Sequence, residues 1–251
     1  MCSSDLRGLP PGFLPKEDLE GGPELKFGNA AAMVYWTREM GLGGSKLAKL
    51  LGEGSYRLCE HYGHPELSMT VKKQEMPAYD GRGVQGIGLT YATSNRGGCH
   101  VRGYTTAPEI VGLPVKVDPH VIDGKPELAK VFHDLTSTID SAGLCLFTSF
   151  ALGADDYAEL LKGGTGWDVT GDEVMLIGER VWNLEKLYNI REGWTPKDDE
   201  LPKRLTTEPI LKGPSQGKVS QVPAMLPVYY EKRGWDAKGH PTKETLEKLG
   251  L

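Results

Sequence analysis

Two short stretches carry the residue types that do chemistry, and the first is TIDSAGLCLF, residues 138–147. The carboxylate of Asp140 stands five residues before the thiol of Cys145, with Gly143 between them. A carboxylate can accept paired N–H donors, a glycine lets the backbone approach a ligand closely, and a thiolate is a ligand for iron–sulfur clusters. A capped helix start with a buried cysteine has the same pattern. These residues alone leave both interpretations open.

The second stretch is YATSNRGGCHVRGYT, residues 91–105, which gathers Arg96, His100 and Arg102 in a glycine-rich segment. Cationic side chains beside exposed backbone N–H groups suit phosphate or another anion. A histidine can take or give a proton near neutral pH. The alternative is a hydrogen-bonded structural histidine between solvated arginines. The remaining histidines lack metal-ligand spacing such as HExxH and are interpreted as structural or solvent-facing.

Two further segments hold polar residues whose role the sequence does not decide. In MPAYDGRG, residues Tyr79, Asp80 and Arg82 can form a turn with an internal ion pair or contribute to a pocket wall. The segment ERVWNLEKLYNIREG is expected to be a helix whose polar side chains fix neighbouring loops by hydrogen bonds. Those side chains are Arg180, Asn183, Asn189 and Arg191.

The composition excludes several classes of protein. The 251 residues carry a formal net charge of −5, which disfavours nucleic acid or an anionic membrane as the main partner. No apolar run approaches the roughly 20 residues of a membrane-spanning helix. The start, MCSSDLRGLPPGF, has no apolar signal-peptide core, so a cytoplasmic location is expected. The four cysteines form no CxxC pair, which argues against a structural zinc site and disulfides.

The periodicity predicts a mainly α fold with long irregular loops, divided into residues 1–68 and 69–251. Asn29 and Ser45 are expected helix caps, and Asp172 and Glu173 favour the start of a long helix. An irregular loop or broken helix is expected over 76–103, a short buried helix over 142–153, and an irregular proline-rich segment over 195–227. Helices are expected over 30–40, 46–52, 54–61, 127–138, 154–166, 170–193 and from 242 to the end, with a short strand near 69–73.

Several stretches together resemble a known family. LKFGNA, MPAYDGRGVQGIGLTYATSNRGGCHVRGYT, DSAGLCLF, ERVWNLEKLYNIREG and RGWDAKGHPTKETLEKLGL follow one another as in the tungsten-containing aldehyde:ferredoxin oxidoreductases. The resemblance runs from about Leu14 onward, and DxxGLC is a family signature. It covers the end of the family's middle α-helical domain and its last domain. Residues 1–12 resemble nothing in the family, although the family-like ending suggests a complete C-terminus.

The resemblance implies an enzyme that oxidises a small aldehyde to a carboxylate. Electrons would pass from a tungsten (or molybdenum) bis-pterin centre through a [4Fe–4S] cluster to ferredoxin. By the same resemblance, His100 lies near the metal and Cys145 is the fourth cluster ligand. The pterins would be held by Asp140, Gly143, Leu144, Arg102 and Arg96.

The family's first domain, its CxxCxxxC triplet, its first DxxGL motif and its active-site glutamate have no counterpart in this sequence. The isolated chain is therefore expected to hold neither cluster nor tungsten, and to need the missing N-terminal domains as partner. One alternative is a non-catalytic helical scaffold with an apolar surface. Another, a thiol hydrolase of Cys145 and His100, is disfavoured because GLCLF is too apolar to lower a thiol pKa. The resemblance is compatible with a homo-oligomer. It does not specify which aldehyde is the substrate or whether the metal is tungsten or molybdenum.

Overall fold

The structure is a computed structural model that describes residues 13–19, 21–26 and 28–251. Cys2 and the start of the chain discussed above lie outside these residues. Helices dominate, as predicted: α1 (Ala30–Leu42), α2 (Lys46–Gly52), α3 (Ser55–His61), α4 (Gln85–Thr93), α5 (Lys125–Ser141), α6 (Ala154–Thr165), α7 (Gly171–Arg191), α8 (Lys203–Thr207), α9 (Val222–Lys232) and α10 (Lys243–Leu249). The strands β1 (Thr70–Val71) and β2 (Gln74–Glu75) pair in an antiparallel hairpin. Short 3₁₀ turns cover Lys16–Leu19, Pro65–Leu67, Leu146–Phe150 and Pro196–Asp199, and a π turn covers Ala107–Val111.

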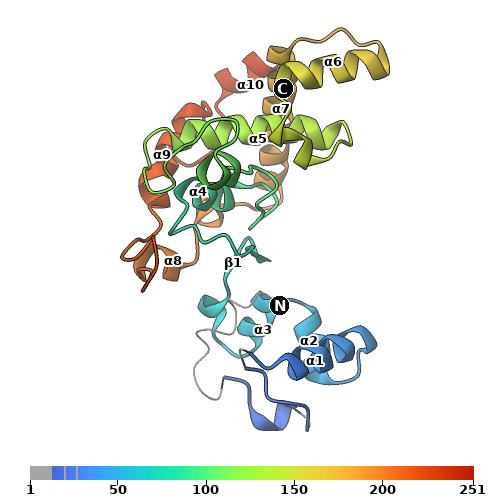
Figure 1. The fold of residues 1–251 in the computed structure, drawn as a ribbon, viewed down its shortest axis with the longest axis vertical. Helices are drawn as coiled ribbons and strands as arrows, with labels where there is room; N and C mark the ends of the chain where they lie inside the picture. Colours follow the sequence, from blue (N-terminus) through green and yellow to red (C-terminus); the bar gives the residue numbers. More distant parts are fainter. Residues whose placement is uncertain (1–12, 20, 27) are drawn as a thin grey trace.

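The first three helices form a small block at one end of the molecule (Figure 1). The predicted caps are present, because the Asn29 side chain accepts the N–H of Ala32 and Ser45 accepts that of Ala48. The helices pack around a core of their own that contains the fully buried Trp36. The hairpin of β1 and β2 lies between this block and the rest of the chain in Figure 1. The boundary at residue 68 stays a prediction.

The larger part of the molecule is built on α5 and α7, with α4, α9 and α10 packed around them. The buried face of α5 is largely polar. His133 is fully buried, whereas the apolar side chain of Val131 is 49% exposed. Many of the buried polar groups find partners, as when Tyr229 pairs with His133 Nδ1 and Asp134 with Arg233, whereas His133 Nε2 is buried without a hydrogen-bond partner among the described residues. Hydrogen bonding makes this burial tolerable.

Two expectations about the elements are wrong, and a third named two alternatives. Of the irregular loop or broken helix expected over 76–103, the structure has the helix α4 between loops, and every residue of α4 is buried. Its Gly88 lies against Gly81, where an added Cβ would come 3.0 Å from the Gly81 carbonyl oxygen, so the glycine serves close packing. The proline-rich segment enters α9, which tolerates Pro223 in its first turn and also contains Pro227. The segment 142–153, expected to be a short buried helix, contains instead a 3₁₀ turn over Leu146–Phe150 that has no buried residue.

None of the helices in the described part of the chain is long and apolar enough to cross a membrane.

Alkaline pH is expected to unfold the protein because several tyrosines are buried. Burial raises the pKa of Tyr229 to about 12, and it also raises the pKa values of Tyr91 and Tyr230. A phenol with a raised folded-state pKa stabilises the fold fully below its unfolded value near 10. This stability is lost as the pH rises through the folded-state value. Tyr229 alone should therefore contribute a loss of about 3 kcal/mol between pH 10 and 12.

Urea unfolding followed by far-UV circular dichroism at pH 9.5 and pH 11.5 measures this loss. Tyr229→Phe keeps the ring and removes the titrating hydroxyl, so its stability should fall less steeply over the same interval. Equal stability of the wild-type chain at the two pH values would contradict the prediction.

Candidate functional site

Arg102 joins the two chemistry-bearing stretches of the sequence. Its Nη1 donates to Asp140 Oδ2 at 2.7 Å, and its Nη2 donates to Glu185 Oε2 at 2.6 Å. The guanidinium also lies 5.5 Å from the ring centroid of Trp182 on α7. The structure thus brings together Arg102 and Asp140, which the sequence analysis assigned to one site. Glu185 is a third member that the sequence analysis did not find.

Asp140 lies at the C-terminal end of α5, where its side chain remains 38% exposed. The contact with Arg102 occupies Oδ2 and gives this carboxylate a fixed orientation. A second carboxylate oxygen is left to accept an N–H from a ligand at the surface, which is the pairing expected of a carboxylate with a ring edge.

A cavity of about 440 Å³ lies between the glycine-rich segment and α7. Its lining residues are Asn95, Arg96, Arg102, Leu184, Glu185, Tyr188 and Asn189. Asn189 holds the loop in place because its Nδ2 donates to the carbonyl of Asn95 at 2.7 Å. This is the loop-fixing role expected for the polar residues of α7. Arg96 and Arg102 bring positive charge to the cavity, and Glu185, which is paired with Arg102, brings a carboxylate to the same wall.

His100 lies beside two tyrosines. Its ring centroid is 5.6 Å from that of Tyr79 and 5.7 Å from that of Tyr104, and the two tyrosine hydroxyls are hydrogen bonded at 2.7 Å. Burial, with a smaller contribution from the Arg96 charge, lowers the pKa of His100 below its usual range. The imidazole is therefore neutral at pH 7 and able to accept a proton.

Arg96 is partly engaged within its own loop. Its Nη2 lies 2.8 Å from Cys99 Sγ, and Cys99 is buried. This contact fixes the turn that precedes His100. Arg96 also lines the cavity of about 440 Å³ described above, which is the smaller of two cavities considered. The side chain therefore combines a structural contact with a position suited to an anionic ligand.

The segment that carries Cys145 lies at the surface of the molecule. Residues 140–145 are all exposed, including Leu144 and Cys145. Gly143 has φ +70° with open space around its Cα, so the turn itself demands a glycine. Thr148 Oγ1 donates to the Cys145 carbonyl at 2.7 Å and holds the turn. The thiol is therefore accessible rather than part of the core.

The described residues contain no group of three or more His, Cys, Asp and Glu side chains arranged to hold a metal ion. Among the cysteines that the structure describes, Cys59 and Cys99 are buried and Cys145 is exposed. An iron–sulfur cluster needs several cysteine ligands. The described residues therefore do not by themselves bring together the several cysteines that such a cluster takes.

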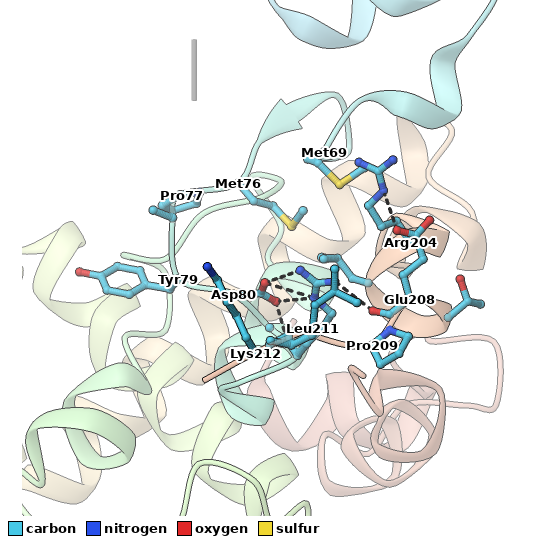
Figure 2. A pocket seen from close by; sticks show the side chains of 16 residues that line it. Met69, Met76, Pro77, Tyr79, Asp80, Arg204, Glu208, Pro209, Leu211 and Lys212 are labelled. Carbon is cyan, nitrogen blue, oxygen red and sulfur yellow. Dashed lines mark hydrogen bonds and ion pairs between the residues drawn. The ribbon is translucent and has the colours of Figure 1, made fainter. Parts of the chain in front are cut away.

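A larger cavity of about 880 Å³ lies between residues 69–82 and residues 204–212 (Figure 2). Asp80 and Arg82 form an ion pair at 2.7 Å in its wall. Arg82 Nη1 also donates to the Glu208 carbonyl at 2.9 Å, which joins the two sides. Both roles considered for this segment, the turn with an ion pair and the pocket wall, are therefore present.

Comparison with known proteins shows which family this helical fold belongs to. The family model for aldehyde ferredoxin oxidoreductase, domains 2 and 3, matches residues 10–251. The chain belongs to the aldehyde ferredoxin oxidoreductase family, as the sequence motifs predicted.

Curated relatives agree with this assignment. The chain is 51% identical over 245 residues to the tungsten-containing aldehyde ferredoxin oxidoreductase of Pyrococcus furiosus, and 48% identical over 242 residues to that of Thermococcus kodakarensis. It is 30% identical to the WOR-like subunit of an aliphatic sulfonate oxidoreductase from Pyrococcus furiosus. These matches cover 96% of the chain but only 40%, 40% and 37% of the relatives, respectively.

A solved structure shows the same fold. The active-site complex BamBC of benzoyl-coenzyme A reductase, in complex with 1,5-dienoyl-CoA, aligns with a TM-score of 0.73 at 19% sequence identity. The alignment covers 96% of this chain and 41% of that one. At this identity the likeness concerns the fold alone.

Proposed function

We propose that this chain supplies part of the active site of an enzyme that oxidises aldehydes to carboxylates, together with a polypeptide that carries the remaining domains. The reaction joins an aldehyde and water to give a carboxylic acid, two protons and two electrons. The observation that carries this proposal is the link from Arg102 to Asp140, five residues before the exposed thiol of Cys145. Membership of the aldehyde ferredoxin oxidoreductase family supports the assignment of these residues to one active site.

The pterin contacts are proposed for the face around Arg102. Asp140 would accept ring N–H groups, and Gly143 and Leu144 would present their exposed backbone. Arg102 and Arg96 would face the phosphates from the smaller cavity. When bound, the tungsten or molybdenum bis-pterin centre supplies the two-electron redox chemistry.

His100 is proposed as the catalytic residue of this chain. Its neutral imidazole can accept a proton released when water adds its oxygen to the aldehyde carbon. Tyr79 and Tyr104, bonded to each other and packed on the ring, restrict its orientation.

Cys145 is proposed as one ligand of a [4Fe–4S] cluster that would pass electrons to ferredoxin. The thiol is exposed, as a ligand shared with another polypeptide must be before assembly. The other three thiolates would come from the partner, since clusters of this type take four.

A non-catalytic scaffold is the second candidate, and exposed apolar side chains favour it. Phe147 is 64% exposed, Trp167 54% and Tyr188 56%. Such residues are typical of a surface that another protein covers. A partner polypeptide is expected in both cases, so cofactor content and activity distinguish them.

Anaerobic co-expression with an N-terminal fragment of a family member that carries the CxxCxxxC triplet tests the proposal. The purified complex is expected to contain iron and tungsten or molybdenum, and to reduce a redox dye with an aldehyde. The chain expressed alone is the control and should do neither. A stable complex that lacks metal and activity would favour the scaffold.

A further inference from the structure

The larger cavity has apolar walls of a size suited to an organic ligand. Met69 and Met76 are buried at one wall, and the facing segment contributes the buried Leu205, with Ile210 and, at the rim, Leu211, which is 85% exposed. Small-molecule sites typically measure roughly 300–1,000 Å³ with mainly apolar linings. At about 880 Å³, this cavity is far larger than a two-carbon aldehyde or acid requires.

Among the described charged side chains that line the cavity, two ion pairs cancel and one lysine remains unpaired. Asp80 is paired with Arg82, and Arg204 is paired with Glu208 at 3.2 Å. Lys212 is the remaining charged lining residue, and no carboxylate of the described chain lies within ion-pair distance of it. The ammonium group therefore stands at an apolar wall with its charge available to an anion.

The cavity is connected to the proposed catalytic residue through Tyr79. This tyrosine lines the cavity, and its ring centroid is 5.6 Å from that of His100. In Figure 2, Tyr79 lies on one side of the cavity, Arg204 and Glu208 lie on the other, and Lys212 stands between them. A ligand in the cavity would therefore be a neighbour of the site and would not occupy it.

We propose that this cavity binds a monocarboxylate with an apolar body, holding the body against the methionines and the carboxylate at Lys212. The inference rests on the proposed function in one respect, because oxidation of an apolar aldehyde would generate such an acid beside the cavity. It extends that function by naming aldehydes with larger apolar bodies as the substrates and their acids as ligands of the cavity beside the site.

Isothermal titration calorimetry of the full isolated chain with octanoate, acetate and 1-octanol tests the inference. Octanoate is expected to bind at least about tenfold more tightly than acetate, because its longer chain buries apolar surface. 1-Octanol should bind more weakly than octanoate because it lacks the charge. Lys212→Met should weaken octanoate binding about threefold to fivefold, the size expected for one exposed ion pair. Leu211→Asp, which places a negative charge beside Lys212, should weaken it as well.

Two matched variants distinguish a local effect from a general loss of positive charge or of surface apolarity. Lys218→Met removes an exposed lysine from the same loop outside the cavity, and Val115→Asp changes an aliphatic side chain that is 69% exposed elsewhere. Both should bind octanoate as the wild type does. Octanoate that fails to bind, or binds equally to the Lys212→Met chain, overturns the inference, as does 1-octanol with the affinity of octanoate.

Because this measurement needs neither metal nor partner, its failure is separate from a failure of the proposed function. If the complex oxidises aldehydes but the isolated chain does not bind octanoate, only the inference that the cavity binds a monocarboxylate is refuted. An inactive complex whose chain binds octanoate through Lys212 would refute only the proposed function.

Discussion

Replacing Asp199 by asparagine is expected to lower the free energy of unfolding by about 3–5 kcal/mol, the usual effect of breaking a buried ion pair. Asp199 is fully buried and accepts hydrogen bonds from Lys186 at 2.9 Å and from Tyr230 at 2.8 Å. Its second oxygen lies 2.9 Å from Lys72 Nζ. Burial alone would raise the pKa of Asp199, but the two lysines hold it below its usual value.

The loss arises because two ammonium groups would remain without their carboxylate. Lys186 is almost fully buried, and burial lowers its pKa to about 8 even beside Asp199. The loss of unfolding free energy should therefore be smaller when the buried ammonium group of Lys186 is removed as well. The double variant of Asp199→Asn with Lys186→Met should recover part of the stability.

Urea unfolding at pH 7 provides the measurement, with Asp168→Asn as the matched control. Asp168 pairs with Lys162 at 2.7 Å on the surface, where solvent screens the pair, so its loss should change stability little. Equal effects of the Asp199 and Asp168 changes would contradict the importance of this buried cluster.

Replacing His100 by asparagine is expected to reduce kcat/KM for aldehyde oxidation by the reconstituted complex about 10²–10⁴-fold. Asparagine can still donate and accept hydrogen bonds, but it cannot take a proton near pH 7. The iron and tungsten content should stay at the wild-type level, because the proposal assigns His100 to proton transfer and the binding contacts to other residues.

Initial dye-linked rates over a range of aldehyde concentrations measure kcat/KM, and His64→Asn is the control. His64 lies in the N-terminal block, where it pairs with Glu66 on the surface. That variant should keep the wild-type rate. A His100 variant with full activity would remove His100 from the mechanism, and one that lost its metals would give it a structural role.

The sequence predicted best those elements whose signals are local. Asn29, Ser45 and Thr242 cap helices because their side chains accept an N–H three residues on, and this depends on neighbouring residues alone. The bounds of α4 were not predicted because its glycines are typical of loops. Gly88 lies against Gly81 and Gly86 lies against Glu109, which are neighbours that the pattern does not reveal.

The candidate site was predictable in part. Family motifs pointed to Arg102 and Asp140, which meet across 38 residues of sequence. Glu185 was missed because a glutamate on an amphipathic helix is usually a solvated residue. Tyr104 was missed because its role depends on contact with Tyr79 and His100, which only the tertiary structure brings about. The exposure of Cys145 was not predictable from the apolar run around it, since that run is typical of a buried segment.

Iron analysis of the co-expressed complex, with and without Cys145→Ser, tests most directly the claim that this chain completes a site shared with another polypeptide. The account predicts about four iron atoms per complex, the number in a [4Fe–4S] cluster, and a marked loss in the serine variant. Cys59→Ser, at a buried thiol away from this surface, should keep the iron. A full iron content in the Cys145→Ser complex would contradict the account.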